Sequence, residues 1–80
     1  MSKVTLYTRC GCHLCEDAKQ VIESARSRIP FVLEVVDIDQ QPALRQLYTN
    51  EVPVIAIDGV KAFKYKVSMD EFLKKLAARS

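Results

Sequence analysis

The sequence contains no long run of apolar residues. The longest, Phe31 to Val36 and Val52 to Ile57, fall far short of the roughly 20 residues that span a bilayer as a helix. The N-terminal segment Met1 to Tyr7 turns polar and strand-like at once, without the apolar stretch and cleavage site of a secretory signal peptide. We therefore expect a cytoplasmic protein, in a reducing compartment, that does not insert into a membrane.

An excess of charge of one sign is also lacking. The chain has 12 lysine and arginine residues against 10 aspartate and glutamate residues, which leaves a formal net charge of +2. Basic residues gather only at Lys61, Lys64 and Lys66, which are spaced like the outward positions of a strand, with acidic residues nearby. We expect no nucleic-acid partner.

Linkers, repeats and low-complexity segments are absent, and the chain has only 2 glycines. Its 80 residues fit one domain, and a chain of this size buries only about 60% of the surface that it exposes when unfolded. We expect a single domain over residues 1–80 that acts as a monomer.

A strand followed by a helix opens the predicted fold. Val4 to Thr8 is rich in β-branched and aromatic residues and predicts a short strand. Apolar residues that recur at steps of three and four predict one face of a helix that ends at Pro30: Leu14, Ala18, Val21, Ile22, Ala25 and Ile29. Phe31 to Val36 predicts a second, largely apolar strand, consistent with burial on both faces in a parallel pair.

A short helix and a hairpin follow. Asp39 offers an N-cap, and Pro42 fits the first turn of a short helix. Val54 to Ile57 and Val60 to Phe63 flank Asp58-Gly59, a pair favoured in type I′ turns. The pattern predicts two antiparallel strands joined by a tight turn.

A last helix completes the order βαβαββα. Ser68, with Glu71 three residues later, forms a capping box for a helix whose apolar face is Met69, Phe72, Leu73 and Leu76. The first two strands form a right-handed parallel crossover, and the hairpin has to join the same sheet to cover its apolar face. This predicts an α/β fold with a four-stranded mixed sheet flanked by helices on both sides, and ligand binding beyond the carboxyl ends of the parallel strands.

All three cysteines lie in the short segment from Cys10 to Cys15, which follows the first strand. An odd number of cysteines at one end argues against a disulfide scaffold, which would staple distant segments. Cys12 and Cys15 form a C-x-x-C at the predicted helix start, a spacing that brings two sulfurs within disulfide reach across one turn. We expect these cysteines to be kept for their reactivity.

The two thiols of the C-x-x-C should differ in character. Cys12 would face the unpaired N–H groups and the positive end of the helix dipole, which favour its thiolate, whereas Cys15 would be more shielded. This predicts Cys12 as the attacking nucleophile and Cys15 as the resolving thiol. Arg9 and a protonated His13 would add positive charge beside Cys12, and two acidic residues in the next half-turn would oppose it.

A metal site is the alternative explanation. A structural zinc site needs four ligands, and Cys10, Cys12, His13 and Cys15 are the candidates. His13 would project away from its neighbours on a tight helical turn, and the chain has no second C-x-x-C or histidine pair, so we expect no structural metal. A metal-binding or metal-delivery module that uses Cys10, Cys12 and Cys15 stays as the alternative function, because soft metals prefer thiolates.

Several roles of Cys10 stay open. It is a free surface thiol, or a regulatory or second resolving thiol. A bridge to Cys12 would close a small strained ring, and a bridge to Cys15 is the other pairing.

The C-x-x-C between a strand and a helix, together with Val52-Pro53 ahead of a hairpin, resembles the thioredoxin fold. Within that superfamily, the short length and the segments Gly11 to Ala18 and Glu51 to Ile55 are similar to those of small glutaredoxin-like proteins. The resemblance covers nearly the whole chain. It implies a thioredoxin-like fold and a glutaredoxin-like thiol-disulfide oxidoreductase that serves cell redox homeostasis.

The resemblance also implies roles for particular residues. Cys12 would be the nucleophile and Cys15 the resolving cysteine, with Pro53 facing them after a cis peptide bond. The Val52 backbone would pair with an extended thiol substrate, as in β-strand addition. Ser68 could accept a substrate carboxylate at the start of the last helix, although capping alone also explains it.

The expected partners are a disulfide-containing protein or glutathione substrate, and a thiol or reductase that supplies electrons. No bound cofactor is expected, and glutathione is a candidate cosubstrate. The chain departs from typical glutaredoxins at Lys64 to Asp70, which stands where a Gly-Gly-x-Asp turn holds the γ-glutamyl end of glutathione, and at His13-Leu14, which replaces Pro-Tyr. A further alternative is a redox-inactive adaptor that binds a partner at the Val52-Pro53 edge.

Overall fold

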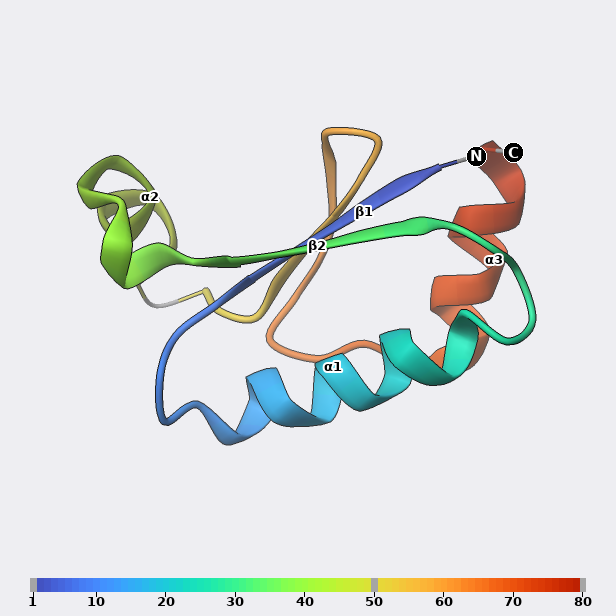
Figure 1. The fold of residues 1–80 in the computed structure, drawn as a ribbon, viewed down its shortest axis with the longest axis horizontal. Coiled ribbons are helices and arrows are strands. Elements are labelled where there is room, and N and C mark those ends of the chain that lie inside the picture. Colours follow the sequence, from blue (N-terminus) through green and yellow to red (C-terminus); the bar gives the residue numbers. More distant parts are fainter. Residues whose placement is uncertain (1, 50, 80) are drawn as a thin grey trace.

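The computed structural model describes residues 2–49 and 51–79, and Figure 1 shows their path. The elements follow in the order β1 (Lys3–Thr8), α1 (His13–Ala25), β2 (Val32–Asp37), a short 3-10 helix η1 (Ile38–Gln40), α2 (Pro42–Tyr48), β3 (Val54–Ile57), β4 (Val60–Lys64) and α3 (Met69–Arg79). This is the predicted βαβαββα order, with η1 added ahead of α2.

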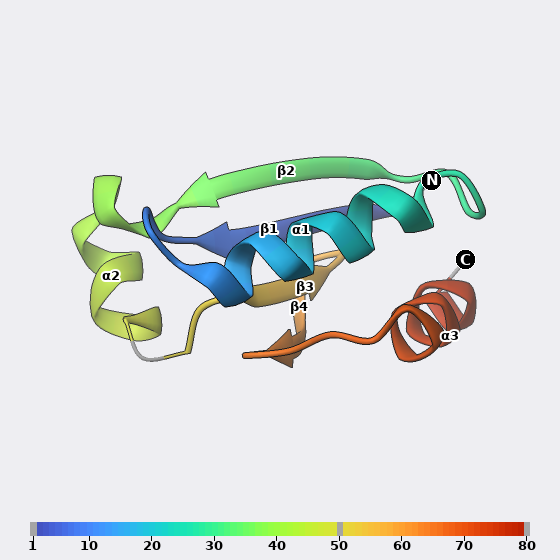
Figure 2. The same cartoon turned by 90° about the horizontal axis from the view of Figure 1, so that it is seen from below.

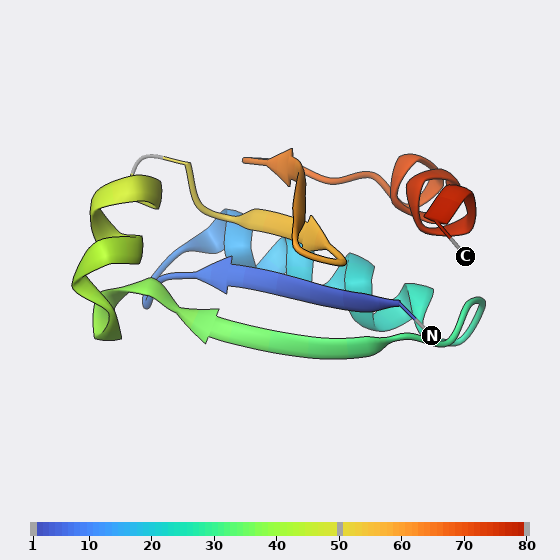
Figure 3. The same cartoon turned by 90° about the horizontal axis from the view of Figure 1, so that it is seen from above.

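The four strands form one mixed sheet in the order β2-β1-β3-β4, which confirms the predicted architecture. β1 and β2 are parallel, as a strand-helix-strand crossover requires, whereas β3 runs antiparallel to both β1 and β4. Figure 3 shows β1 between β2 and β3. The carboxyl ends of β1 and β2 therefore lie at the same end of the sheet, and the loops that follow these strands start there.

The hydrophobic core lies between one face of the sheet and the helices α1 and α3. Because side chains alternate across a strand, Val4 and Leu6 of β1 point to the same face. The buried cluster draws apolar side chains from both layers: Val4, Leu6, Ala18, Ile22, Ala25, Phe31, Ile55, Ile57, Phe72 and Leu76. Figure 2 shows α1 lying across the strands on this side.

Helix α2 reaches the opposite face at one end of the sheet. Tyr7 alternates with Leu6, and its ring centre lies 5.0 Å from that of Tyr48 at the end of α2. In Figure 1, α2 follows the end of β2 and lies away from α1. Helices therefore flank both sides, as predicted, but the 7 residues of α2 cover only part of the second face.

Strand β2 is less buried than predicted. The expectation that it is buried on both faces is wrong, because Val32 is 50% exposed and Val35 is 47% exposed. The strand order places β2 at the edge of the sheet, and α2 continues beyond its end instead of lying over it. An apolar run identifies a strand, but it does not say which neighbours the strand has.

Helix α1 ends earlier than predicted. It ends at Ala25 instead of continuing to Pro30, and the backbone N–H groups of Arg28 and Ile29 both donate to the Ala25 carbonyl in a turn. The residue before a proline avoids the helical conformation, so the helix has to end before Ile29. Ile29 still packs against the core, which explains why it fits the helical periodicity.

Asp39 is not the N-cap that the sequence predicted. It lies within η1, whose own N-cap is Asp37, and the Asp39 N–H donates to the Asp37 carboxylate at 2.9 Å. Helix α2 begins at Pro42, the proline predicted for its first turn. The Asp39 carboxylate instead pairs with the guanidinium groups of Arg9 and Arg45.

The hairpin and the last helix agree with the predictions. Asp58 and Gly59 have φ values of 52° and 84°, and both central residues of a type I′ turn need positive φ. The Glu71 N–H donates to Ser68 Oγ at 3.2 Å, which is one of the two bonds of the capping box. Across residues 2–49 and 51–79, no helix has the length and apolar character needed to cross a membrane.

Candidate active site

The candidate site lies at the end of the sheet where β1 finishes. β1 leads through residues 9–12 into α1, and on its other side Tyr7 pairs with Val54, so that Pro53 comes next at the same end. Figure 3 shows the start of α1 and the segment that leads into β3 at the same end of the molecule. The fold thus brings the C-x-x-C and Val52-Pro53 to one place.

Cys12 is the N-cap of α1. Its backbone is extended, with φ −94° and ψ 112°, and its sulfur accepts a hydrogen bond from the Cys15 N–H at 3.2 Å. Oxygen-bearing side chains usually hold this position, where they meet the unpaired N–H groups at the positive end of the helix dipole. A sulfur in the same position has surroundings that suit a thiolate, as expected for an attacking group.

Cys15 lies in the first turn of α1 and is only 4% exposed. Burial raises the pKa of the Cys15 thiol, and its hydrogen bond with Cys12 raises the pKa further. Hydrogen bonds from the Thr8 hydroxyl and the Arg9 backbone to the Cys15 sulfur oppose this rise. The buried thiol therefore keeps its proton at neutral pH, in line with a group that acts second.

Thr8 is a site residue that the sequence reasoning missed. It is the last residue of β1, and its side chain lowers the pKa of the Cys15 thiol. Alternation along β1 puts Thr8 on the same face as Leu6, which is the face that α1 covers. Strand periodicity could have placed Thr8 beneath the start of α1.

The Val52-Pro53 peptide bond is cis, as the resemblance implied. The Pro53 carbonyl accepts a hydrogen bond from the Tyr65 N–H at 3.0 Å, which joins this segment to the end of β4. The Val52 N–H donates to the Tyr48 carbonyl at 3.2 Å. This donor is therefore used within the protein, and a strand pairing with Val52 would rest on its carbonyl.

The other predicted substrate-binding residues are more dispersed. The Arg9 side chain donates to Asp39 at 3.1 Å and is held against η1. His13 is the exposed first residue of α1, directly after Cys12. Ser68 lies at the start of α3, where its hydroxyl is occupied as a cap. Of these three, His13 is the one whose position in the chain keeps it beside Cys12.

Cys10 is exposed and precedes Gly11, whose φ of +76° turns the chain toward the helix start. Within the part of the chain that the structure describes, no group of three or more His, Cys, Asp or Glu side chains could hold a metal ion. The described geometry therefore gives no support to the metal-binding alternative.

A cavity of about 270 Å³ lies next to the C-x-x-C, between α1 and the segment that follows β4. Its walls include Leu14 and Tyr65. Leu14 is 38% exposed, so its expected place on the buried face of α1 is wrong, because the buried face runs through Cys15, Ala18, Ile22 and Ala25 and Leu14 lies to one side of it. Tyr65 is 44% exposed and has a φ of 67°.

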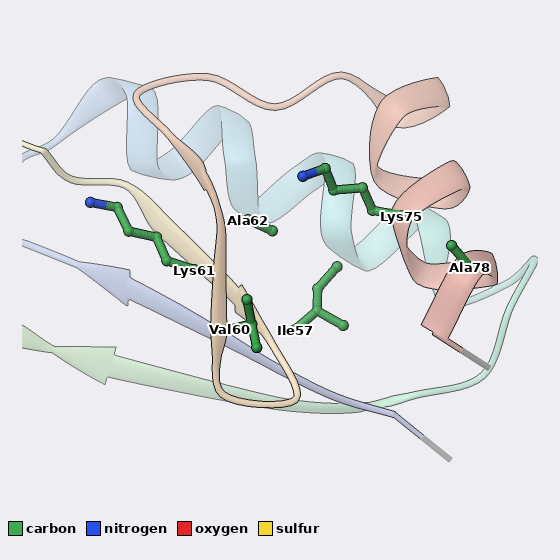
Figure 4. Close-up of a pocket in the computed structure, with 6 residues that line it drawn as sticks. All are labelled: Ile57, Val60, Lys61, Ala62, Lys75 and Ala78. Carbon is green, nitrogen blue, oxygen red and sulfur yellow. The ribbon is translucent and has the colours of Figure 1, made fainter.

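A separate cavity of about 220 Å³ lies between the β3–β4 hairpin and α3 (Figure 4). Its walls include Ile57, Val60 and Ala78, and Lys75 reaches from α3 toward the hairpin. Ile57 pairs with Val4 near the start of β1, at the opposite end of the sheet from the cysteines. This cavity is therefore remote from the C-x-x-C.

Comparison with known proteins gives a family match across nearly the whole chain. The model of the glutaredoxin-like domain family (DUF836) matches residues 3–77. A glutaredoxin-like protein of Dictyostelium discoideum is 34% identical over 74 residues, which cover 85% of this chain and 68% of that protein. An uncharacterized protein of Mycobacterium tuberculosis is 29% identical over 62 residues, which cover 71% of this chain and 64% of that protein. The chain therefore spans about two thirds of the length of these curated relatives.

Solved structures agree with this match. A protein from X. campestris superposes with a TM-score of 0.80 at 29% identity, covering 94% of this chain and 96% of the other. A protein from Nitrosomonas europaea gives a TM-score of 0.81 at 31% identity, covering 94% and 91%. A thioredoxin from Halobacterium salinarum, at 17% identity, has a TM-score of 0.74 over 96% of this chain and 73% of its own, which supports the thioredoxin-like fold alone. On the match over residues 3–77, the chain belongs to the glutaredoxin-like domain family.

Proposed function

We propose that the chain is a thiol-disulfide oxidoreductase that uses Cys12 and Cys15 to reduce protein or glutathione mixed disulfides. The observation that carries this proposal is the arrangement at the start of α1. The Cys12 sulfur caps the helix and accepts the Cys15 N–H at 3.2 Å, while the Cys15 side chain is buried beneath it. One thiol is thus placed to attack and the other to resolve.

The first step is an exchange of one disulfide for another. The Cys12 thiolate attacks one sulfur of the substrate disulfide, a bond forms between these two sulfurs, and the substrate disulfide breaks. The other substrate sulfur leaves as a thiolate and takes up a proton from solvent. The product is a mixed disulfide on Cys12.

The second step releases the substrate. Cys15 loses its proton and attacks the Cys12 sulfur, the Cys12–Cys15 bond forms, and the remaining substrate sulfur leaves as a thiolate. The substrate has gained two electrons and the dithiol has lost two. A thiol or a reductase supplies two electrons to restore the dithiol, and glutathione is one candidate for this role.

The surroundings of the cysteines favour an extended peptide as substrate. The Val52 carbonyl can accept a hydrogen bond from a peptide N–H, since the Val52 N–H is occupied by Tyr48. The cavity with Leu14 and Tyr65 in its walls offers apolar surface for a side chain next to the substrate cysteine. Backbone pairing together with a neighbouring side-chain pocket is the usual arrangement for binding a peptide at a sheet edge.

Substitution of Cys12 tests the proposal. We expect Cys12→Ser to lower turnover of a disulfide-bonded peptide, with dithiothreitol as reductant, by at least about a hundredfold, or about 2.7 kcal/mol in activation free energy. Serine is a good N-cap, so the variant keeps the helix start and removes only the nucleophilic sulfur. Turnover is followed by chromatography of the reduced peptide.

Substitution of Cys15 provides the matched variant. Cys15→Ser keeps the first step and loses the second, so the peptide accumulates as an adduct of the whole protein that mass spectrometry detects. An equal urea-unfolding midpoint for wild type and both variants shows that the fold is kept. Wild-type turnover by Cys12→Ser would refute the assignment.

A further inference from the structure

Cys10 and Cys15 face one cavity at the end of β1. The cavity has a volume of about 280 Å³, and its walls include Thr8, Arg9, Cys10 and Cys15. Among the described residues that form its walls, both Cys10 and Cys15 are present and Cys12 is not. Cys10 and Cys15 therefore share a cavity that Cys12 does not line.

The Cys15 sulfur has partners in two segments. Cys12 lies at the helix cap and raises the pKa of the Cys15 thiol, whereas Thr8 and Arg9 lie at the end of β1 and lower that pKa. Thr8 and Arg9 directly precede Cys10 and lie in the walls of the same cavity. Residues 8–10 and Cys15 thus line one cavity.

The segment that carries Cys10 is held at both ends. The Arg9 side chain is paired with Asp39 at 3.1 Å, and Gly11 takes a φ of +76° as the chain turns into the Cys12 cap. Cys10 is exposed, whereas Cys15 is 4% exposed. The cavity is therefore lined by one exposed and one buried cysteine.

We propose that Cys10 is a second resolving thiol, which attacks the Cys15 sulfur of the Cys12–Cys15 disulfide through this cavity and moves the bridge to Cys10–Cys15. The inference rests on the proposed function, because it starts from the disulfide that the proposed cycle forms. Thiol-disulfide exchange proceeds through a nearly linear array of three sulfurs, and the attacking thiol therefore has to approach opposite the leaving one. A cavity that Cys10 and Cys15 line and Cys12 does not is consistent with such an approach.

The step balances without an external oxidant. Cys10 gives up its proton and its thiolate attacks Cys15, so that the Cys10–Cys15 bond forms and the Cys12–Cys15 bond breaks. Cys12 leaves as a thiolate at the helix cap, and the number of disulfides in the chain is unchanged. An oxidised chain in this form still presents the Cys12 thiolate and can react with another disulfide.

The position of the bridge is measured directly in the full chain. The protein is equilibrated with oxidised dithiothreitol and quenched with acid. Free thiols are blocked with N-ethylmaleimide, and bridged thiols are then reduced and blocked with iodoacetamide. Trypsin cleaves after Arg9 and Lys19, so the three cysteines fall in one peptide, Cys10 to Lys19, in which fragmentation by mass spectrometry locates each label.

N-ethylmaleimide on Cys12 marks a molecule whose bridge joins Cys10 and Cys15. We expect this label in about a tenth or more of the singly oxidised molecules, which is the proportion when the equilibrium constant between the two bridges is within about tenfold of one. Cys12→Ser should still form a bridge, between Cys10 and Cys15. Cys10→Ser is the matched control, in which the bridge lies between Cys12 and Cys15.

Two results would overturn the inference while leaving the proposed function intact. One is N-ethylmaleimide on Cys10 alone in every singly oxidised wild-type molecule, with no bridge in Cys12→Ser. The other is N-ethylmaleimide on Cys15, which would mean that the bridge joins Cys10 and Cys12. The absence of any Cys12–Cys15 bridge in Cys10→Ser would instead refute the proposed function, and the inference with it.

Discussion

At the scale of single residues, the start of α1 makes the two thiols of the C-x-x-C different. Cys12 lies at the cap, where the helix offers an N–H group to its sulfur, and Cys15 lies one turn in, against Thr8. The chemical difference comes from position, since both side chains are the same. A nucleophile and a resolving thiol need this division of surroundings.

The raised pKa of Cys15 predicts how the resolving step depends on pH. Only the thiolate attacks, so the rate rises about tenfold per pH unit until the Cys15 pKa is passed. An ordinary cysteine reaches its plateau above about pH 8.5, and burial shifts the pKa of Cys15 upward. We expect the rate to keep rising beyond that pH, as measured by release of thionitrobenzoate from Cys12 in Cys10→Ser.

The mixed disulfide changes one part of this environment. Once Cys12 carries the leaving group, its own charge and hydrogen bond no longer raise the pKa of Cys15, but burial, the largest cause, persists. A free peptide that contains one cysteine, reacting with the same reagent, serves as the reference. A plateau for the protein at or below that of the peptide would contradict the prediction.

At the scale of elements, local sequence signals predicted turns and caps correctly, but they did not predict which elements lie next to each other. The Asp58-Gly59 turn follows from two residues that accept positive φ, and the Ser68 cap follows from a three-residue spacing. The exposure of β2 depends on its place at the sheet edge, which no residue within β2 encodes. Asp39 is not the cap of α2 because it lies within η1, and its carboxylate pairs with Arg9, a residue remote in sequence.

The same distinction applies to the candidate site. Cys12 and Cys15 were identified from a spacing at a predicted strand-to-helix junction, which is local information. The bonds of Thr8 to Cys15 and of the Val52 N–H to Tyr48 join different elements. These contacts depend on how the helices are placed over the sheet, and the sequence pattern does not encode that placement.

The cap of α3 gives a prediction at this scale. Ser68→Ala removes the acceptor for the Glu71 N–H and should lower the free energy of unfolding by about 1 kcal/mol, measured by urea denaturation. Ser68→Asp keeps an acceptor at the cap and should retain most of the wild-type stability. Equal losses in the two variants would show that the hydroxyl does not act as a cap.

At the scale of the whole molecule, one core joins the two helices to the sheet. Phe72 of α3 is fully buried, and its ring centre lies 5.8 Å from that of Phe31 and 6.3 Å from that of Phe63. These contacts connect α3 to the start of β2 and to β4. Within residues 2–49 and 51–79, the buried cluster holds α1 and α3 on the sheet, so loss of the junction at Phe72 weakens the whole fold.

The size of the core makes that junction decisive. Removal of a buried phenylalanine costs about 3–5 kcal/mol, a large share of the roughly 4–12 kcal/mol expected for a domain of this length. We therefore expect Phe72→Ala to lower the free energy of unfolding by about 3–5 kcal/mol in urea. Leu47→Ala, at a position 63% exposed on α2, is the matched control and should change stability by less than about 0.5 kcal/mol. If both variants lost a similar amount of unfolding free energy, α2 would contribute to the core as much as α3 does, and the prediction would be wrong.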